Sequence, residues 1–318
     1  MNPRLALVAD GQGGVFSRNQ ALAAGYTPEQ IQERLGDGRW ERVRHGQYSE
    51  RLDLGQLPPW ERELQLHRRL VHAAMNSMHP GTAVVSHHSA LILHGVPVWQ
   101  ADLTEVQLTR SSGWRSGAVA GVRHHRGQLT AADVGKVDGL PVTTVARALA
   151  ETAGAGSFEA AVVSADAALR GGRLSDDEVR RVLEQTEYWP GGPNIRSALA
   201  FANPLAESVG ESRFRVLMHQ QGLPAPALQV TYEDADGVIG RVDFDFPGRD
   251  TVVEFDGLMK YADGGREALI QEKIREDRLR ALGLQVVRAT WHDLAHPRRA
   301  ASGIWRAFDR ARRTRLAG

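Results

Sequence analysis

The pattern of helix-like and strand-like segments changes at about residue 205, and this change most constrains how the chain can fold. Beyond it, a helix-like segment at residues 207–221 precedes three strand-like runs separated by two turn sequences: ALQVTYE, DADG, GRVDFDF, PGRD and DTVVEFD. A helical segment at 265–282, a fourth strand-like run, LQVVRAT, and an arginine-rich helix follow. This pattern predicts an α/β domain over residues 205–318, with a mixed sheet flanked by helices.

The composition excludes several classes of protein. The chain has 318 residues, more than the ~250 at which a single core usually stops growing. It has no cysteine, so a bound metal must be held by carboxylates, histidines or backbone oxygens. The N-terminal apolar stretch is too short for a signal peptide, and no apolar run approaches the ~20 residues of a membrane span. We therefore expect a cytoplasmic protein with no membrane partner.

The charges are balanced in number but not in position. Lys and Arg total 39 against 38 for Asp and Glu, and a net charge of +1 gives by itself no reason to expect nucleic-acid binding. Basic residues nevertheless cluster near both ends of the chain: Arg39, Arg42, Arg44 and His45, and Arg298, Arg299, Arg306, Arg310, Arg312, Arg313 and Arg315. Such clusters are typical of a phosphate-contacting surface, although an arginine-rich terminal helix is equally typical of a solvated face.

The first 55 residues carry the signals of a small winged helix-turn-helix. Ser17 is a candidate N-cap for one short helix, and Thr27, followed by proline, caps a second helix that ends at Gly36. The run GRWERVRHGQYS then alternates apolar and basic residues around a turn at Gly46, as a two-stranded wing does. We therefore assign residues 1–55 to a DNA-binding winged helix-turn-helix.

The basic residues of this region are candidates for contact with DNA. Arginines bind phosphates, and residues on the second helix reach base edges. The candidates are Gln30, Arg34, Arg39, Arg42 and Arg44, with Gln32 and Glu33 beside Gln30. The alternative is that the helix-turn-helix serves a protein contact or only packs.

Residues 56–204 form a middle α+β region by their pattern. A helix is expected over 57–79, short strands over 104–138, and mostly helices from 145 to about 202. Histidines gather here: His87, His88, His94, His124 and His125. Because they lack metal-ligand spacing with a partner acid, we interpret them as incidental or hydrogen-bonded side chains.

Acidic residues alternate with apolar ones on two of the C-terminal strands. Alternation places Val242, Phe244 and Phe246 on one face and sends Asp243 to the other. It also sends Glu254 and Asp256 together to one face. Because the PGRD turn makes the two strands hairpin partners, their carboxylates can converge and would repel without a cation between them. Mg²⁺ or Mn²⁺ is the natural occupant of such an oxygen-rich site.

Basic residues close by decide between two interpretations of these acids. Either acidic pair alone is more often a solvated strand face. Four basic residues lie just downstream, however: Lys260, Lys273, Arg275 and Arg278. A cation and a lysine beside a phosphate are what metal-assisted phosphodiester hydrolysis needs. Lys273 also stands four residues before Asp277, so the two could simply form a helix salt bridge.

The C-terminal motifs resemble a known family. The runs GRVDFDFP, VVEFDG, EKIREDRLRALG and LQVVRATWHDL are similar to proteins related to very-short-patch-repair endonucleases, in the PD-(D/E)XK nuclease superfamily. The resemblance implies a restriction-endonuclease-like fold with Asp243 and Glu254 as motif acids and Glu211 as an accessory acid. Asp256 stands where the motif has lysine, so Lys260 or Lys273 would replace it. The implied metal ligands are Glu211, Asp243, Glu254 and Asp256, and Arg275 and Arg278 are further candidates for DNA contact.

The N-terminal motifs resemble a different family. The segments QGGVFSRNQALAAGYTPEQIQERLGDGRWERVRHGQYS, SHHSALILHGVPVW and GLPVTTVARALAETA are similar to AbiEi-type antitoxins. This resemblance implies binding of promoter DNA and a toxin protein as partner.

Three functions are therefore open. The first is a DNA-binding, Mg²⁺-dependent endonuclease. The second is a non-catalytic transcriptional regulator or antitoxin of a type IV toxin-antitoxin system. The third is a protein-interaction module whose acids only shape its surface.

Overall fold

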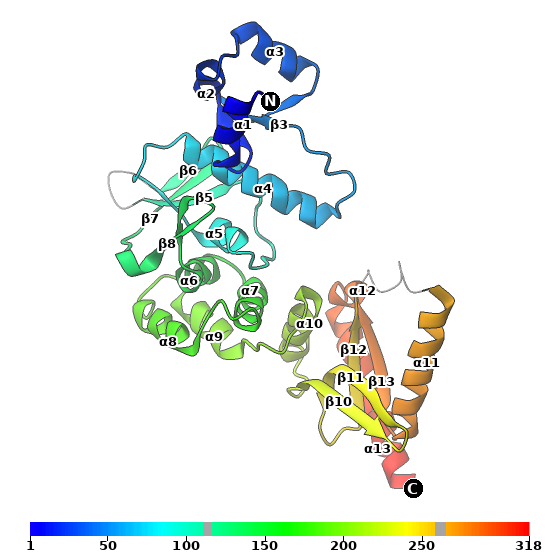
Figure 1. The fold of residues 1–318 in the computed structure, drawn as a ribbon. Helices are drawn as coiled ribbons and strands as arrows, with labels where there is room; N and C mark the ends of the chain where they lie inside the picture. Colours follow the sequence, from blue (N-terminus) through cyan, green and yellow to red (C-terminus); the bar gives the residue numbers. More distant parts are fainter. Residues whose placement is uncertain (111–115, 258–264, 318) are drawn as a thin grey trace. The chain divides into compact units, whose positions relative to one another are not determined.

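The computed structural model describes residues 1–110, 116–257 and 265–317 (Figure 1). The chain forms two compact units, and each is described by itself. The first consists of Met1–Ser164 and Leu174–Ser197, and the second of Ala165–Arg173 and Ala198–Gly318. The first unit holds both the winged helix and the middle sheet, so the division at residues 55 and 204 stays a prediction.

The predicted winged helix is present at the start of the first unit. Its elements are α1 (Pro3–Asp10), β1 (Val15–Ser17), α2 (Arg18–Ala23), α3 (Pro28–Gly36), β2 (Trp40–Arg44) and β3 (Gln47–Glu50). The strands are antiparallel in the order β1-β3-β2. Ser17 and Thr27 cap α2 and α3 in reciprocal capping boxes, as their sequence positions predict. The helix α1 and the strand β1 were not predicted.

A mixed six-stranded sheet follows in the same unit, in the order β6-β7-β5-β4-β9-β8. Its strands are β4 (Val84–Val85), β5 (Val106–Arg110), β6 (Gly117–Val119), β7 (Val122–Arg126), β8 (Val134–Val137) and β9 (Leu140–Thr143). The helices around it are α4 (Pro59–Asn76), α5 (His87–Leu93), the short 3₁₀ helix η1 (Ala131–Asp133), α6 (Val145–Ala155) and α8 (Asp176–Gln185). The α+β pattern predicted for this region is confirmed. Two further helices, α7 (Phe158–Arg170) and α9 (Gly192–Phe201), have residues in both units.

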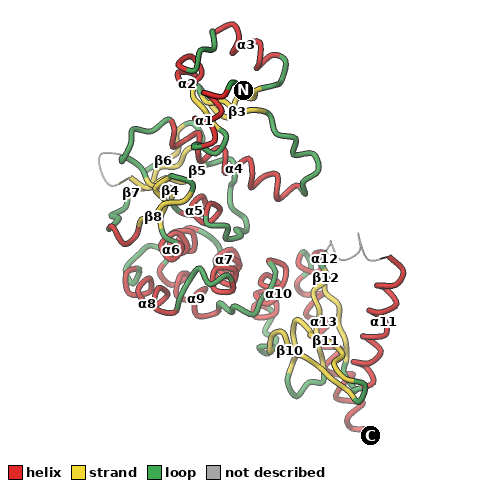
Figure 2. The backbone as a smooth tube through the Cα atoms, in the orientation of Figure 1, coloured by secondary structure: helices red, strands yellow, loops and turns green. Residues whose placement is uncertain are grey.

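The second unit has the element order expected from its sequence, with one short helix, α12, that was not predicted. The elements are α10 (Val209–Gln220), β10 (Ala227–Asp234), β11 (Gly237–Phe246), β12 (Thr251–Asp256), α11 (Gly265–Ala281), β13 (Gln285–Thr290), α12 (Trp291–Leu294) and α13 (Pro297–Ala317). The four strands, all labelled in Figure 1 and drawn in yellow in Figure 2, pair in the order β10-β11-β12-β13. The β10–β11 and β11–β12 pairs are antiparallel and β12–β13 is parallel, so the sheet is mixed. The finer resemblance to restriction endonucleases stays a prediction.

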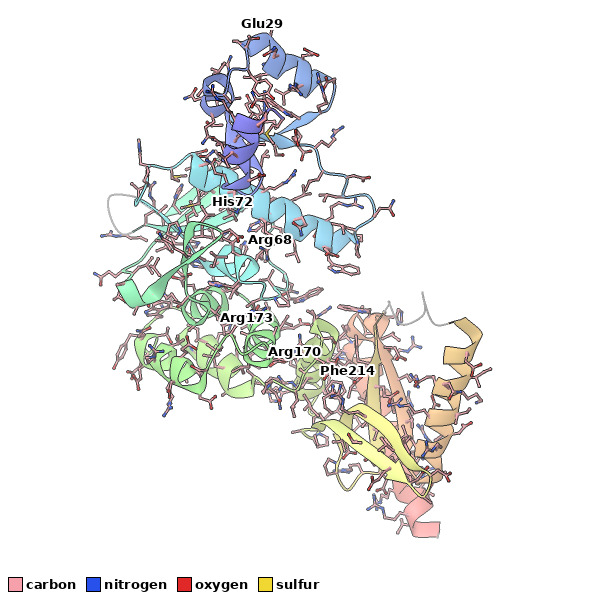
Figure 3. All side chains as sticks on the ribbon, viewed as in Figure 1. Glu29, Arg68, His72, Arg170, Arg173 and Phe214 are labelled. Atoms are coloured by element: carbon pink, nitrogen blue, oxygen red, sulfur yellow. The ribbon has the colours of Figure 1, made fainter. Side chains whose placement is uncertain are left out.

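Two apolar clusters hold helices to opposite faces of this sheet. Phe214 of α10, labelled in Figure 3, packs with Phe255 of β12 and Phe308 of α13. On the other face, Leu279 of α11 packs with Val252 of β12. Within the described ranges, none of the helices is long and apolar enough to cross a membrane.

The alternation of β11 breaks at Asp243. Phe244 packs in the cluster of Phe214, as predicted, but Val242 packs in the cluster of Leu279. The partner strand has Gln229 opposite this point, with a φ of 56°. A left-handed backbone at a residue other than glycine twists the strand locally. The prediction that Val242 shares a face with Phe244 is therefore wrong.

Candidate functional site

Glu211 and Asp243 are linked by one glutamine. The Nε2 of Gln229 donates to Oε2 of Glu211 at 2.9 Å and lies 3.5 Å from Oδ1 of Asp243. Glu211 also accepts from the backbone N–H of Glu207 at 2.9 Å and the hydroxyl of Ser208 at 2.8 Å. Burial raises the pKa of Glu211, and the negative charge of Asp243 adds to the rise. These two acids of the predicted site therefore lie close together, although they come from α10 and β11.

Asp243 also contacts the neighbouring strand. Its Oδ2 accepts from the backbone N–H of Phe255 at 2.7 Å. Phe255 stands between Glu254 and Asp256, and the hairpin predicted through the PGRD turn is confirmed by the β11–β12 pairing. The structure thus brings Asp243 to the strand that carries the other two predicted acids.

Glu254 and Asp256 are buried and paired with arginines. Their exposed fractions are 5% and 7%, so the alternative of a solvated strand face is wrong for both. Oε1 of Glu254 lies 2.5 Å from Nη2 of Arg275, and Oε2 lies 3.3 Å from Nη2 of Arg288. Oδ2 of Asp256 lies 3.1 Å from Nη1 of Arg288. Buried charges need partners of this kind, and here the partners are guanidinium groups.

Arg288 stands at the centre of this network. It comes from β13, where it is the cross-strand partner of Glu254 in the parallel pair. Besides Glu254 and Asp256 it contacts Glu272 and Glu276 of α11. Burial alone would lower its pKa, but hydrogen bonds to Glu272 and Asp256 outweigh this, so the pKa rises. Sequence reasoning missed this residue, although an arginine inside the apolar run LQVVRAT was a visible signal.

The arginines supply the positive charge that the sequence assigned to Mg²⁺ or Mn²⁺. Across the part of the chain that the structure describes, no group of three or more His, Asp or Glu side chains is placed to hold a metal ion. As placed here, the four acids do not fit a divalent cation, because Arg275 and Arg288 hold two of them. Metal binding stays a prediction, and it requires these guanidinium groups to move away.

The basic residues predicted to serve catalysis and DNA contact have different surroundings. Lys260 lies outside the described residues. Lys273 is exposed on α11. Arg275 also donates to the backbone carbonyl of Arg241 at 2.8 Å, and Arg278 pairs with Asp234 at 2.5 Å. Arg275 and Arg278 thus hold α11 to the sheet, and their predicted contact with DNA is untested.

In the winged helix, α3 has the position of a recognition helix, and two of its predicted DNA contacts have a structural role. Gln30 accepts from the backbone N–H of Thr27 at 3.0 Å, which closes the capping box. The guanidinium of Arg34 lies over the rings of Tyr26 and Trp40, at 5.1 and 5.5 Å from their centroids. Arg34 therefore packs against the core of the winged helix.

The arginines of the wing differ in whether their guanidinium groups already have partners within the protein. Arg39 pairs with Asp37, whose Oδ2 accepts from its Nε at 2.6 Å, and with Glu33 at 2.9 Å. Arg44 donates to the backbone carbonyl of Ala120 at 3.2 Å. Arg42 is exposed, and it has no ion-pair partner within residues 1–110, 116–257 and 265–317. Of the predicted phosphate ligands, Arg42 is thus the one most available to DNA.

This segment has known relatives. Residues 3–50 match the family model described as "Transcriptional regulator, AbiEi antitoxin". The AbiEi-like segment runs from α1 to β3, so it covers the winged helix and confirms the N-terminal resemblance over those residues. Its helix α1 was missed by sequence reasoning, although Asn2 before a proline is a helix-start signal, and Asn2 does accept from the backbone N–H of Leu5 at 2.9 Å.

Similarity over a longer stretch is found in Mycobacterium tuberculosis. The "Uncharacterized protein Rv2248" of strain H37Rv is 29% identical over 287 residues, which cover 90% of this chain and 98% of that protein. The "Uncharacterized protein MT2308" of strain CDC 1551 matches with the same figures. The similarity therefore extends well beyond the AbiEi-like segment, into both compact units.

Proposed function

We propose that the chain is a DNA-binding transcriptional regulator of the antitoxin type, which binds operator DNA through its AbiEi-like winged helix. The observation that carries the proposal is the match of residues 3–50 to a family of transcriptional regulators. Those residues build a complete winged helix with an exposed recognition helix and an exposed wing arginine.

The exposed side chains suggest how the winged helix contacts DNA. The second helix of a helix-turn-helix lies in the major groove, and here that helix is α3. Gln32 and Glu33 are exposed on it. Glutamine pairs with adenine, so Gln32 reads a base edge, whereas the carboxylate of Glu33 could accept from cytosine only after leaving Arg39. Arg42 on β2 contacts a backbone phosphate beside the groove and adds affinity that does not depend on sequence.

A gel-shift titration on the DNA upstream of the chain's own gene tests this proposal. We expect a salt-dependent shift, which Arg42→Ala weakens while reducing the salt slope by about 1. Gln32→Ala should instead relax the preference for the operator over unrelated DNA. The matched control is Arg173→Ala, because Arg173 is an exposed arginine outside both basic clusters, and it should leave binding unchanged. Equal binding by the Arg42 and Arg173 variants, or no shift at all, would overturn the proposal.

A toxin partner belongs to the same proposal, because the matched family is one of antitoxins. We propose that a toxin is encoded next to this chain and that the chain relieves its effect. Growth of cells that express the neighbouring gene, with and without this chain, tests the pairing. Growth arrest that persists during co-expression counts against an antitoxin role and leaves the test of DNA binding untouched.

Metal-dependent phosphodiester hydrolysis is the second candidate function. It is favoured by one observation: Asp243 joins Glu211 through Gln229 and also bonds to the backbone next to Glu254. The acids of the nuclease-like motif thus come from three adjoining elements. The pairing of Glu254 with Arg275 and Arg288 weighs against it.

Incubation with plasmid, linear and single-stranded DNA in Mg²⁺ or Mn²⁺ tests the second candidate. Cleavage that disappears in Asp243→Ala and Glu254→Ala but persists in Glu207→Ala supports hydrolysis at this site, because Glu207 is exposed and pairs only with Arg241 among the described side chains. Cleavage that survives both acid substitutions belongs to a contaminant, and no cleavage with either metal refutes the second candidate.

A further inference from the structure

The first compact unit contains a pocket of about 770 Å³. It is bordered by β5, β7, the start of α5, α6 and the segment after α8, and no residue of the AbiEi-like segment or of the acidic cluster lines it. Small-molecule sites usually measure about 300–1,000 Å³. The pocket therefore has the size of a ligand site, and it is independent of the proposed DNA contact.

Two stacked histidines form one wall. The rings of His87 and His125 are 3.6 Å apart between centroids and 19° from parallel. Nε2 of His125 is hydrogen-bonded to Oε1 of Gln107 at 2.6 Å. Burial lowers the pKa of His87 to about 2 and that of His125 to about 4, so both rings are neutral near pH 7. His87 also has a φ of 52°, a strained conformation that is concentrated at functional sites.

Helix α6 contributes charged side chains to the pocket, in contrast to the neutral histidines. Nε of Arg147 donates to Oε1 of Glu151 at 2.8 Å, and Nη1 lies 3.9 Å from Oδ2 of Asp133. The same guanidinium lies 4.4 Å from the ring centroid of Trp189. Glu151 also accepts from the backbone N–H of His87 at 3.2 Å. The two carboxylates supply hydrogen-bond acceptors inside the pocket, beside flat aromatic and guanidinium surfaces, and burial raises the pKa of Glu151.

Two groups at the pocket lack partners that a ligand would supply. The hydroxyl of Thr109 is buried and makes no hydrogen bond within the described structure. A buried hydroxyl without a partner is costly unless something else fills that role. Arg126 is exposed, lines the pocket and has no ion-pair partner in the described ranges. The rim thus offers a free positive charge, while the interior offers a hydroxyl and carboxylate acceptors.

We propose that this pocket binds a nucleotide. A heterocyclic base stacks against the flat surfaces and directs its N–H groups toward the acidic interior, near Glu151 and the hydroxyl of Thr109. Its phosphate lies at the rim on Arg126, because guanidinium groups bind phosphate through several N–H donors. A base with an exocyclic amino group donates to these acceptors better than uracil does, so AMP, GMP or CMP binds more tightly than UMP.

Isothermal titration calorimetry of the purified full chain tests the proposal with AMP, GMP, CMP, UMP, adenosine and inorganic phosphate. At least one of the first three should bind, and Arg126→Ala should weaken it about tenfold, the loss of one charge-assisted hydrogen bond. Arg126→Ala should leave adenosine binding unchanged. Arg123→Ala is the matched control, since it is an exposed arginine on the same strand that pairs with Glu105 outside the pocket.

Thr109→Val keeps the proposal testable without disturbing the fold, because it replaces a hydroxyl that has no partner with a methyl group of similar size. It should reduce the affinity for the best nucleotide about fivefold or more while the melting temperature without ligand does not fall. Binding of none of the four nucleotides overturns the proposal. So does binding that neither Arg126→Ala nor Thr109→Val changes, or inorganic phosphate bound as tightly as the nucleotides.

Discussion

Replacement of Arg288 by methionine tests whether the acidic cluster is held by arginine. Met is similar in length to the arginine stem, so the substitution removes the charge and keeps most of the apolar packing. Glu254 then retains Arg275 as a partner, but Asp256 loses the cation with which it pairs at 3.1 Å. Because Asp256 is only 7% exposed, its carboxylate stays buried without compensation.

The size of the effect follows from this geometry. Breaking a buried ion pair by removal of one partner costs 3–5 kcal/mol in general, and the guanidinium of Arg288 is partly exposed, so we expect about 3 kcal/mol. The matched control is Arg280→Met. Arg280 pairs with Glu276 at 2.6 Å within α11, and its side chain is 51% exposed. An exposed pair of this kind contributes less than about 1 kcal/mol.

Urea-dependent hydrogen exchange, resolved by mass spectrometry, separates the two compact units. Peptides from β12 and β13 should lose protection in the Arg288 variant at a clearly lower urea concentration than in the Arg280 variant. Equal destabilisation by the two substitutions would refute the idea that Arg288 neutralises the buried acids.

Three further predictions concern stability. The folded first unit holds His88 and His125 neutral down to about pH 4 and His87 down to about pH 2, whereas the unfolded chain takes up these protons below about pH 6.5. The stability of the first unit should therefore be full at neutral pH and fall with acidification. Thermal melts from pH 7 to 4 check this, and an unchanged melting temperature contradicts it. Gly210→Ala should destabilise the second unit by about 2 kcal/mol, because a Cβ there would lie 2.1 Å from Cε1 of Phe255. Gly303→Ala should instead stabilise α13, because a Cβ there would have no atom nearer than 3.9 Å. Urea unfolding of the two variants compares these effects. Gln30→Ala should destabilise the winged helix by about 1 kcal/mol through loss of the capping box, while Gln32→Ala should leave its melting temperature unchanged.

Local signals were enough to predict most elements. The caps at Ser17 and Thr27 depend on residues three positions apart, so the sequence alone contains both partners. The DADG and PGRD turns likewise connect strands that pair directly, and β10, β11 and β12 follow in chain order. At these caps and turns the prediction was therefore confirmed, although helix α1 was missed and the alternation expected for β11 fails at Asp243.

Long-range partners were not predictable in the same way. Arg288 reaches Asp256 only because β13 joins β12 in parallel, across 32 residues of chain. The histidine pair of the pocket depends on the order of the six-stranded sheet, which brings β7 near the start of α5. Hydrophobic spacing shows which face of a strand is buried, but it does not show which strand lies beside it. The acids could be recognised from the sequence, whereas their partners required the fold.

The partners of the acids also separate the two candidate functions. In a catalyst, the carboxylates must bind a cation during turnover, so Arg275 and Arg288 must withdraw, and Mg²⁺ competes with them. In a regulator, the arginines are permanent parts of the fold. Mg²⁺ should therefore restore stability to Arg288→Met if Glu254 and Asp256 can form a metal site with Asp243, since a ligand that binds only the folded state stabilises it. If Mg²⁺ stabilises neither Arg288→Met nor the unsubstituted chain, the acids serve the fold, and DNA binding by the winged helix is the function that the structure supports.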